Sequence, residues 1–562
     1  MLKSRQFLFE FLRLTKDFWF SDKKLKIRTT VFLLAILTIG QIIMAVLFTK
    51  WSADLFNALE QHSMHDLVLQ IGKLSILVIS HMALTGSHLS VKRNLMVSWR
   101  EWLTDYVLSR WMNSGRHYLI SPMPIEHDNP DGRIAEDCRV ATEDAVSLGH
   151  SLFYSILMLV SFTKVLWSLS GVVTLDLGVV KFPIYGYLVW IAIVYSTLGA
   201  YLGWLVSKPL TGATNKRQSA EAKFRASLLE ANENSQAIAL IHAENYEREQ
   251  FRELFHKIRE MWDEQTKGWR NILMFGTGYG HFSMAFPILI SAPRYILGKI
   301  TLGTLMQSAQ AFQHMTSALS WPVNSAGSIA EWRASVERVL SLLQAIESVD
   351  EEIAKPSRCL QVKSAEREAL IFRDLTICKY NGLVLTENIN MEIEKGDRVL
   401  ITGDTFTGAK LFRAIAQIRP WGSGTILLPS KGRLFFMPPR PRLPTGTLRS
   451  VICYPFARRV FTDDQIRQAL QLAGLESLRE QLDKHENWGH TLDGAEQQRL
   501  GMVRLLINQP HWIFLQEAFS SLEAEEEERM LQLICQHLPE ATILAISHMP
   551  NGTSFYNRSL AL

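Results

Sequence analysis

Long apolar stretches alternate with charged segments over the first 345 residues of the chain. Six stretches are prominent, at about 31–49, 67–89, 148–169, 185–206, 272–297 and 302–323. A helix needs about 20 apolar residues to cross the hydrocarbon core of a bilayer, and four of the six readily meet that requirement. The second and sixth stretches are less apolar, and a buried core helix is the alternative for each. The pattern predicts an all-α transmembrane domain over residues 1–345 with six spans.

Basic residues are divided unevenly among the links between these stretches. Lys and Arg are frequent before the first stretch, between the second and third, and between the fourth and fifth, whereas Lys181 is the only base between the third and fourth. Cytoplasmic loops carry an excess of Lys and Arg, so both termini are expected in the cytoplasm. Residues 7–20 are rich in Phe, Leu and Trp, and we expect them to form an amphipathic helix at the membrane surface.

Residues 215–259 contain neither Pro nor Gly and are rich in Ala, Glu, Lys and Arg. The composition predicts a spanning helix that continues beyond the bilayer and then returns. Such an extension is typical of a transporter whose membrane helices meet a cytosolic domain.

After residue 345 the pattern changes. Residues 346–364 are charged and indicate a linker, and from 365 short β-rich runs alternate with helical patterns. The clearest runs are Val399–Thr402, Leu434–Met437, Trp512–Leu515 and Thr542–Ile546. Alternation of strands and helices predicts an α/β domain with a parallel sheet over residues 365–562.

The overall composition hides this division. The 562 residues have a mean hydropathy of +0.04, an average over two unlike halves. A net charge of +4 is too small to indicate nucleic acid as a partner. The five cysteines are scattered without metal-ligand spacing, so we expect free thiols and no metal site of their own.

Residues 399–416 follow the order of a phosphate-binding loop: a strand, a loop and a helix. Gly403 and Gly408 have the spacing of the pattern G-x-x-x-x-G-K-[ST]. Ala409 stands at the lysine position, and Lys410 stands where Ser or Thr would hold Mg²⁺. Taken alone, this segment is explained as well by an ordinary turn between strand and helix.

Three later segments change that interpretation. Residues 492–499, 512–523 and 546–548 resemble, in order, the signature, the Walker B with D-loop, and the switch-histidine segments of an ABC-transporter nucleotide-binding domain. The membrane half resembles the SbmA/BacA-like family of ABC half-transporters, which are related to the YddA type and to peroxisomal fatty-acyl transporters. The segments that carry this second resemblance are 100–105, 129–137, 221–225, 291–306, 310–312, 319–321 and 330–333.

The resemblance covers the chain from about residue 15 onward and implies a six-helix exporter-type membrane domain fused to a nucleotide-binding domain. It implies a bacterial inner-membrane protein that works as a homodimer, or as a heterodimer with a second half-transporter. Its cofactors would be ATP and Mg²⁺, and its solutes would be peptide-like, cobalamin-like or amphipathic. The implied nucleotide-binding residues are Tyr380, Gly403, Thr407, Gly408, Lys410, Gln516, Gly494 and Glu496, and the implied catalytic residues are Glu517 and His548.

Several positions depart from that family pattern. Besides Ala409, Pro439 replaces the Q-loop glutamine, Asp493 replaces the signature serine, and Gln516 replaces the Walker B aspartate. Phosphoryl transfer depends on Lys and Mg²⁺ to neutralise charge, and each lost contact costs about 2–4 kcal/mol. We therefore predict weak or absent ATP hydrolysis. An ordinary ATP-driven transporter with tolerant motifs remains the alternative.

Two other functions remain open. One is an importer driven by a proton gradient, because some SbmA-like relatives lack a nucleotide domain. The polar residues in or beside spans that would form the solute or proton pathway are Glu221, His281, Lys164, Gln307, Gln310 and His314, with His81 and His88 as further ionisable groups. Simple solvation at the membrane edge, or hydrogen bonding between helices, is the alternative for these residues. The other function is a scaffold or receptor that transports nothing.

Overall fold

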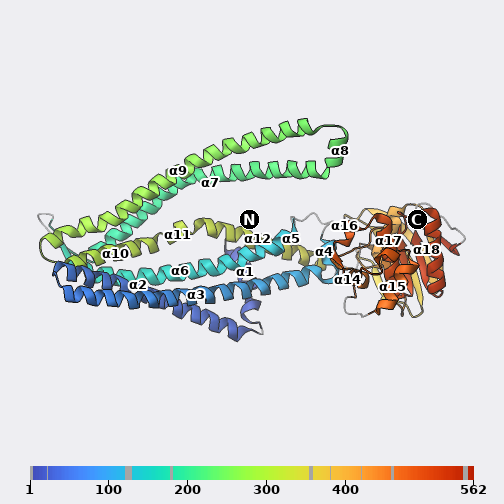
Figure 1. Ribbon diagram of the computed structural model, residues 1–562, viewed down its shortest axis with the longest axis horizontal. Helices are drawn as coiled ribbons and strands as arrows, with labels where there is room; N and C mark the ends of the chain where they lie inside the picture. The colour runs from blue at the N-terminus through green and yellow to red at the C-terminus, as the bar shows by residue number, and fades with distance from the viewer. Residues whose placement is uncertain are drawn as a thin grey trace. The chain divides into compact units, whose positions relative to one another are not determined.

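The computed structural model describes residues 4–21, 23–120, 129–176, 181–353, 359–379, 381–418, 421–456, 461–547 and 555–562 (Figure 1). The chain forms two compact units. The first comprises Met1–Val107 with Asn129–Leu340, and the second comprises Leu108–Asp128 with Ser341–Leu562. The second unit therefore includes a segment from the N-terminal half of the chain. The domain boundaries drawn from the sequence at 345 and 364 remain predictions.

The first unit is built almost entirely from helices. They are α1 (Ser4–Trp19), α2 (Lys24–Glu60), α3 (Met64–Met112), α5 (Pro130–Gly132), a π-helical turn (Arg133–Asp137), α6 (Cys138–Ser170), α7 (Tyr187–Glu233), α8 (Ser235–Leu240), α9 (Glu244–Ile296), α10 (Leu302–Leu319), α11 (Trp321–Asn324) and α12 (Ala326–Ile353). One antiparallel hairpin, β1 (Val172–Asp176) with β2 (Lys181–Tyr185), connects α6 to α7.

Within the described residues, five helices are long and apolar enough to cross a membrane: Lys24–Glu60, Met64–Leu119, Pro130–Ser170, Tyr187–Glu233 and Glu244–Ile296. Together they contain the first five predicted stretches. The sixth stretch forms α10, which ends at Leu319 and is not among these five. The helix packs against α2, α6, α7 and α9, so it needs no wide apolar face toward lipid. The count of six spans remains a prediction.

The long returning helices expected around residues 215–259 are confirmed. Helix α7 continues to Glu233, α8 makes the turn, and α9 returns along α7 (Figure 1). On the extended part, Arg217 donates to Gln265 at 2.9 Å, and Gln265 donates to Thr214 at 3.0 Å. Gln265 is buried although it lies far along the arm, so this chain of bonds holds the two helices together where apolar burial is scarce.

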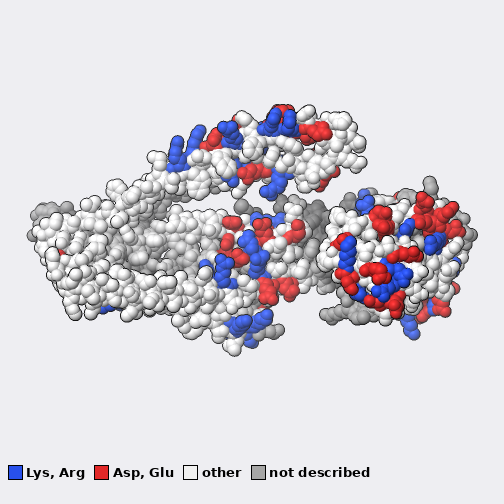
Figure 2. Space-filling view, in the orientation of Figure 1, with Lys and Arg blue, Asp and Glu red and all other residues white. Residues whose placement is uncertain are grey.

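Charged side chains in the first unit gather at one end of its helices and along the outer half of the α7–α9 arm (Figure 2). The opposite end, near α10, presents few charges. This division fits a unit whose apolar part lies in the bilayer. Helix α1 confirms the expected N-terminal helix: Phe18 is buried and stacks on Trp99, whereas Phe9 on the same helix is exposed. The position of α1 on the membrane surface remains a prediction.

The second unit contains the predicted α/β region. Its five-stranded sheet has the order β13-β6-β12-β11-β8, and all four pairings are parallel. The strands are β6 (Arg398–Thr402), β8 (Leu434–Met437), β11 (Trp512–Gln516), β12 (Thr542–Ile546) and β13 (Arg558–Ala561). The four β-rich runs named from the sequence thus became neighbouring strands of one parallel sheet, which confirms the α/β class.

A second sheet and a set of helices complete this unit. The sheet has the order β3-β7-β4-β5, with β3 (Gln361–Ser364), β4 (Ala369–Cys378), β5 (Val384–Glu394) and β7 (Gly422–Leu428). The helices are α4 (Arg116–Leu119), α13 (Thr405–Ile415), α14 (Leu448–Cys453), α15 (Asp463–Leu472), α16 (Trp488–Thr491), α17 (Gly494–Asn508) and α18 (Ala524–His537), with 3₁₀ turns at Asn113–Gly115 and Glu476–Leu478. A two-residue pair, β9 (Gly446–Thr447) with β10 (His485–Glu486), lies beside α14.

Candidate functional site

The carboxyl ends of the parallel strands bring the nucleotide-site candidates to one edge of the sheet. Gly403 follows β6, Glu517 follows β11, and Ser547 follows β12, and these three strands are adjacent. Ligands of open α/β sheets bind at this edge. Tyr380 and His548, the two other candidates expected here, lie outside the described residues.

The segment after Gly403 is helical where a phosphate-binding loop would curve around its ligand. Helix α13 begins at Thr405, and Asp404 caps it. The Asp404 carboxylate accepts the backbone N–H groups of Phe406 and Thr407, each at 3.1 Å, and the Thr407 hydroxyl at 2.6 Å. A helix N-terminus binds phosphate through the same free N–H groups. In this chain, a carboxylate of the chain itself already holds them.

The hydrogen bonds also set the charge of that carboxylate. The bond from the Thr407 hydroxyl, followed by those from the two backbone N–H groups and the field of Lys410, holds the pKa of Asp404 below its usual range. Asp404 is therefore ionised at neutral pH, and it would repel a phosphate brought to the same place.

Gly403 has a reason to be glycine that involves no phosphate. Its φ is +104°, and a Cβ there would lie 2.1 Å from the main-chain oxygen of Leu562. The neighbouring strand β13 approaches so closely that the Asp404 N–H donates to the same oxygen at 3.4 Å. Gly408 likewise serves packing, because a Cβ there would meet Ile546 at 3.0 Å. Both glycines of the motif are thus explained by close packing, against a main-chain oxygen at Gly403 and against an isoleucine side chain at Gly408.

Lys410, the residue nearest to the missing phosphate-binding lysine, is turned into the protein. The side chain is 3% exposed, and its Nζ lies 3.6 Å from the centroid of the Phe406 ring. A cation over an aromatic face is an attractive arrangement. The ammonium group is thus already engaged by the chain itself at the start of α13, where its field also reaches Asp404.

The Walker B-like pair is divided between two pockets. Gln516 lines a pocket of about 710 Å³ with Phe412, Phe436 and Arg440. Glu517 has a φ of +45° and lines a different pocket of about 320 Å³. Its N–H donates to the Ile546 oxygen at 2.9 Å, which fixes the turn. Mg²⁺ prefers carboxylate and water ligands, and the neutral amide of Gln516 supplies no charge to hold it.

The signature-like segment repeats the arrangement at α13. Asp493 caps α17 by accepting the Glu496 N–H at 2.7 Å, and the Glu496 carboxylate accepts the Asp493 N–H at 3.1 Å. Gly494 is the first residue of the helix, and its Cβ position faces Ser521 at 3.2 Å. A capping box of this kind satisfies the N–H groups locally. At both helix starts that would face nucleotide phosphates, an aspartate carboxylate occupies the anion position.

Gln498, which the sequence motifs did not single out as a functional residue, connects three of these segments. Its side chain is buried, donates to the Pro439 oxygen at 3.0 Å and accepts the Ser521 N–H at 2.9 Å. It therefore ties the start of α17 to the segments after β8 and β11. The available signal was its position four residues before Met502 and seven before Leu505, which places a glutamine on the apolar face of the helix.

The structure does not bring the membrane candidates together. Lys164 is exposed on α6, His281 is exposed on α9, and Glu221 forms an ion pair with Arg217 at 3.2 Å on the extended part of α7. The remaining three, Gln307, Gln310 and His314, lie on α10.

Two of the α10 candidates, Gln310 and His314, contact neighbouring helices. The Gln310 amide donates to the Ser52 hydroxyl of α2 at 2.8 Å, and the His314 ring stacks on Phe162 of α6 with centroids 4.4 Å apart. These contacts match the alternative in which the polar stripe bonds one helix to another. They leave the role of the stripe in a solute pathway as a prediction.

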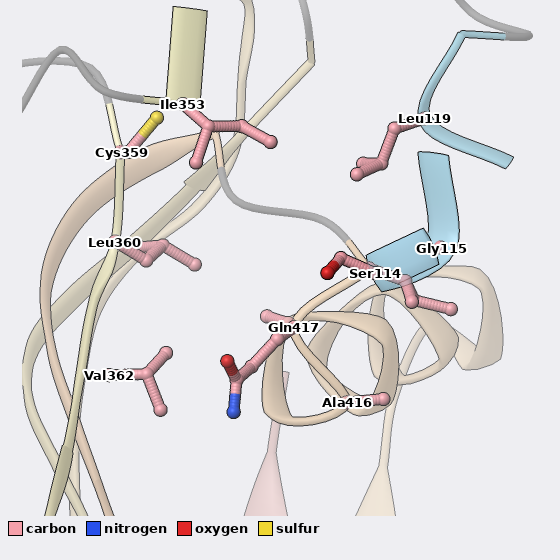
Figure 3. Close-up of a pocket in the computed structure, with 11 residues that line it drawn as sticks. Ser114, Gly115, Leu119, Ile353, Cys359, Leu360, Val362, Ala416 and Gln417 are labelled. Carbon is pink, nitrogen blue, oxygen red and sulfur yellow. The ribbon is translucent and has the colours of Figure 1, made fainter. Parts of the chain in front are cut away.

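The second unit contains a further pocket of about 590 Å³ between α4 and the strands near residue 360 (Figure 3). Leu119 and Gly115 line one side, and Ile353, Leu360 and Val362 line the other, while Gln417 reaches in from the end of α13. A nearby ion pair joins Arg116 to Asp350 at 2.8 Å, so the ends of α4 and α12 are held together within this unit.

The residues at the strand edge do not fit ATP with Mg²⁺. The helix N–H groups are bonded to aspartates of the chain, the nearby lysine is buried, and the Walker B position carries a neutral amide. The edge lies where ligands of open α/β sheets bind, and the residues present there differ from those that a nucleotide needs.

Comparison with known proteins places these observations in a family. Residues 16–295 match the family described as ABC transporter transmembrane region 2. The chain is 30% identical over 558 residues to the inner membrane ABC transporter ATP-binding protein YddA of Escherichia coli (strain K12), covering 97% of this chain and 96% of that protein. It is 25% identical over 622 residues to the chloroplastic ABC transporter D family member 2 of Arabidopsis thaliana, covering 98% and 86%. It is 26% identical over 505 residues to the lysosomal cobalamin transporter ABCD4 of Homo sapiens, covering 83% and 80%.

Proposed function

The chain belongs to the ABC transporter family as a half-transporter with transmembrane region 2, and from that premise we propose a transporter whose C-terminal unit hydrolyses ATP weakly or not at all. It is a multi-pass membrane protein. The observation that carries the proposal is the Asp404 carboxylate at the start of α13, where the family would hold a phosphate. Loss of Lys and Mg²⁺ contacts removes several kcal/mol of transition-state stabilisation, at about 2–4 kcal/mol for each.

Phosphate release by the full chain in lipid nanodiscs, with Mg²⁺ and ATP, tests this proposal. We expect release at the background rate, the same rate for Glu517→Gln, and no saturable binding of a fluorescent ATP analogue at micromolar concentrations. Glu523→Gln, which changes an exposed carboxylate six residues further on, is the matched control. Robust turnover that Glu517→Gln abolishes and Glu523→Gln preserves would sink the proposal.

We further propose that a second copy of the chain completes the transporter. At the tip of the α7–α9 arm, Leu240 is 72% exposed and Ile241 is 74% exposed, which is costly for a monomer. The pocket lined by Phe412, Phe436 and Arg440 is apolar and open enough to receive such a tip from another copy. A homodimer is favoured over a heterodimer because one chain supplies both surfaces.

The mass of the protein in nanodiscs checks this assembly. We expect a dimer, and we expect Leu240→Asp with Ile241→Asp to shift the population toward monomers. Leu228→Asp with Leu229→Asp, an adjacent pair of leucines on the same arm, is the control and should leave the dimer intact. A parent protein that is monomeric at micromolar concentration would contradict the proposal.

The solute proposed for this chain is amphipathic, with peptide-like and cobalamin-like molecules as the first classes to test. One relative is named a lysosomal cobalamin transporter. Thermal unfolding of the nanodisc-embedded protein should shift upward with the correct class, whether or not ATP is present. No shift with any class would favour a scaffold or receptor of other specificity.

A proton gradient is the second candidate for the driving force, and the poor fit of the strand edge to ATP favours it. The proposed topology puts both termini in the cytoplasm of a bacterial cell, at its inner membrane. Uptake into inverted and right-side-out vesicles, with either a pH gradient or ATP imposed, separates the two drivers. Uptake that follows ATP alone would remove the proton-driven candidate.

A further inference from the structure

A pair of histidines joins α3 to α6 inside the first unit. His88 Nε2 lies 2.8 Å from His150 Nε2, and the ring centroids are 4.5 Å apart. His88 is buried at 7% exposure. The two residues are 62 positions apart in sequence, so the contact exists only because the two helices pack together. Neither residue belongs to the nucleotide edge or to the polar stripe of α10.

The geometry restricts how many protons the pair can hold. A hydrogen bond between two Nε2 atoms requires one N–H donor and one lone pair. Two neutral imidazoles satisfy this when one ring carries its hydrogen on Nε2 and the other carries it on Nδ1. With one added proton, an imidazolium donates to a neutral imidazole, and the bond is again satisfied. With two added protons both Nε2 atoms carry hydrogen, the bond is lost, and two positive charges face each other.

Around the histidine pair, the basic side chains come from α3 and most other neighbours are apolar. Lys92 lies one turn from His88 on α3, with Arg93 beside it. On α6 the Tyr154 ring lies 6.3 Å from that of His150. Helices α1 and α2 contribute apolar side chains to the adjoining cluster, and α11 donates from Trp321 to Ser151 at 3.0 Å.

The carboxylates of α6 itself, Glu143 and Asp144, lie toward the start of that helix. Asp144 lies about two turns from His150. Glu143 forms ion pairs with Arg100 and Arg139, each at 3.6 Å. The nearest fixed charge of the pair is therefore positive, and it opposes a second proton.

We propose that His88 and His150 form a proton-binding site that holds α3 against α6 with at most one added proton and releases the two helices when both imidazoles are charged. The ligand is the proton. The site is a conformational device of the membrane unit, and it operates whether ATP or a gradient drives transport.

Pulsed spin-label distance measurements on the full chain in nanodiscs test the proposal. The labels are placed at exposed positions Leu89 on α3 and Phe153 on α6, in a variant whose five native cysteines are replaced by serine. Between pH 8 and pH 4 we expect the mean distance to increase by about 1–2 Å or more, the size of known helix shifts. The change should be absent from His88→Gln with His150→Gln and preserved in His65→Gln, which alters an exposed histidine of α3.

The Lys92→Met variant distinguishes a proton-binding role of the two histidines from a merely structural one, because only the former makes the pH midpoint depend on the charge of Lys92. Removing the positive charge makes double protonation easier, so the midpoint of the distance change should move to higher pH. A distance that is constant between pH 8 and pH 4 would overturn the proposal, and so would a change that persists without the two histidines. A midpoint that does not move in Lys92→Met would assign the change to another titrating group.

Discussion

Helices α10 and α13 both begin at a well-satisfied N-terminus, but the groups that satisfy them come from different distances along the chain. At α13 the cap is Asp404, two and three residues before the N–H groups that it accepts. At α10 the Leu302 N–H donates to Glu60 at 2.9 Å, and the Gly303 N–H donates to Asn57 at 3.0 Å, both on α2. The cap at α13 is local, whereas α10 has a local cap, Thr301, and in addition two acceptors that it meets only in the folded membrane unit.

The difference shows what each helix start can do. The local cap at α13 forms as soon as the helix forms, and it takes up the Phe406 and Thr407 N–H groups that a phosphate would otherwise use. The distant cap at α10 instead fixes a helix rich in Gln, Ser and Thr against a spanning helix, so a polar segment is held inside a membrane unit. Breaking the distant cap should therefore disturb the membrane fold more than breaking the local one.

The largest effect is expected from Gly303→Ala. A Cβ at this position would lie 2.1 Å from the Ala53 oxygen and 2.4 Å from the Asn57 Oδ1, so α10 has to move away from α2. We expect a loss of about 3 kcal/mol or more in the free energy of unfolding, measured by thermal unfolding in nanodiscs.

Gly278→Ala on α9 is the matched control, because no atom lies within 4 Å of its Cβ position. This control should leave the melting temperature unchanged or raise it slightly. Equal melting temperatures for the two variants would mean that the close contact between α2 and α10 is absent in the membrane.

A smaller effect is expected from Asn57→Ala. The substitution removes one of the two α2 acceptors and leaves the Gly303 N–H without its partner, at a cost of about 1–2 kcal/mol. Asn94→Ala, on an exposed position of α3, controls for the loss of an amide. A double variant with Glu60→Ala, which removes the second acceptor, should lose more than either single variant, because the two acceptors serve neighbouring N–H groups.

The features that the sequence predicts are the local ones, like the cap at α13. The strand runs, the first five apolar stretches and the long returning helices are local patterns of the sequence, and the structure contains them as strands and long helices where they were expected. Asp404 and Asp493 were also visible, as small acidic residues at the start of helices. Predicting that they cap the helices required only the rule that Asp favours this position.

The rest could not be predicted, because it depends on contacts between distant parts of the chain. Asn57 with Gly303, Ser52 with Gln310, and His88 with His150 meet only through packing of helices. The sequence therefore indicated a polar stripe on α10 without showing that α2 satisfies part of it. Gln498, buried between three loops, was missed for the same reason.

The smallest expected effect concerns the local cap and its pH dependence. The Thr407 hydroxyl, with the N–H groups of Phe406 and Thr407, lowers the pKa of Asp404 relative to the unfolded chain, where it is about 3.9. A lowered pKa gives stability that is present above the unfolded value and is lost as the pH falls through the folded value. Asp404→Ala should thus lower the melting temperature slightly at pH 7 and flatten its decline between pH 5 and pH 2.

Asp464→Ala, at an exposed acidic position of α15, should keep the slope of the parent. If Asp404→Ala and the parent declined in parallel, the carboxylate would not be bonded at the start of α13, and the argument that it excludes phosphate would fail with it.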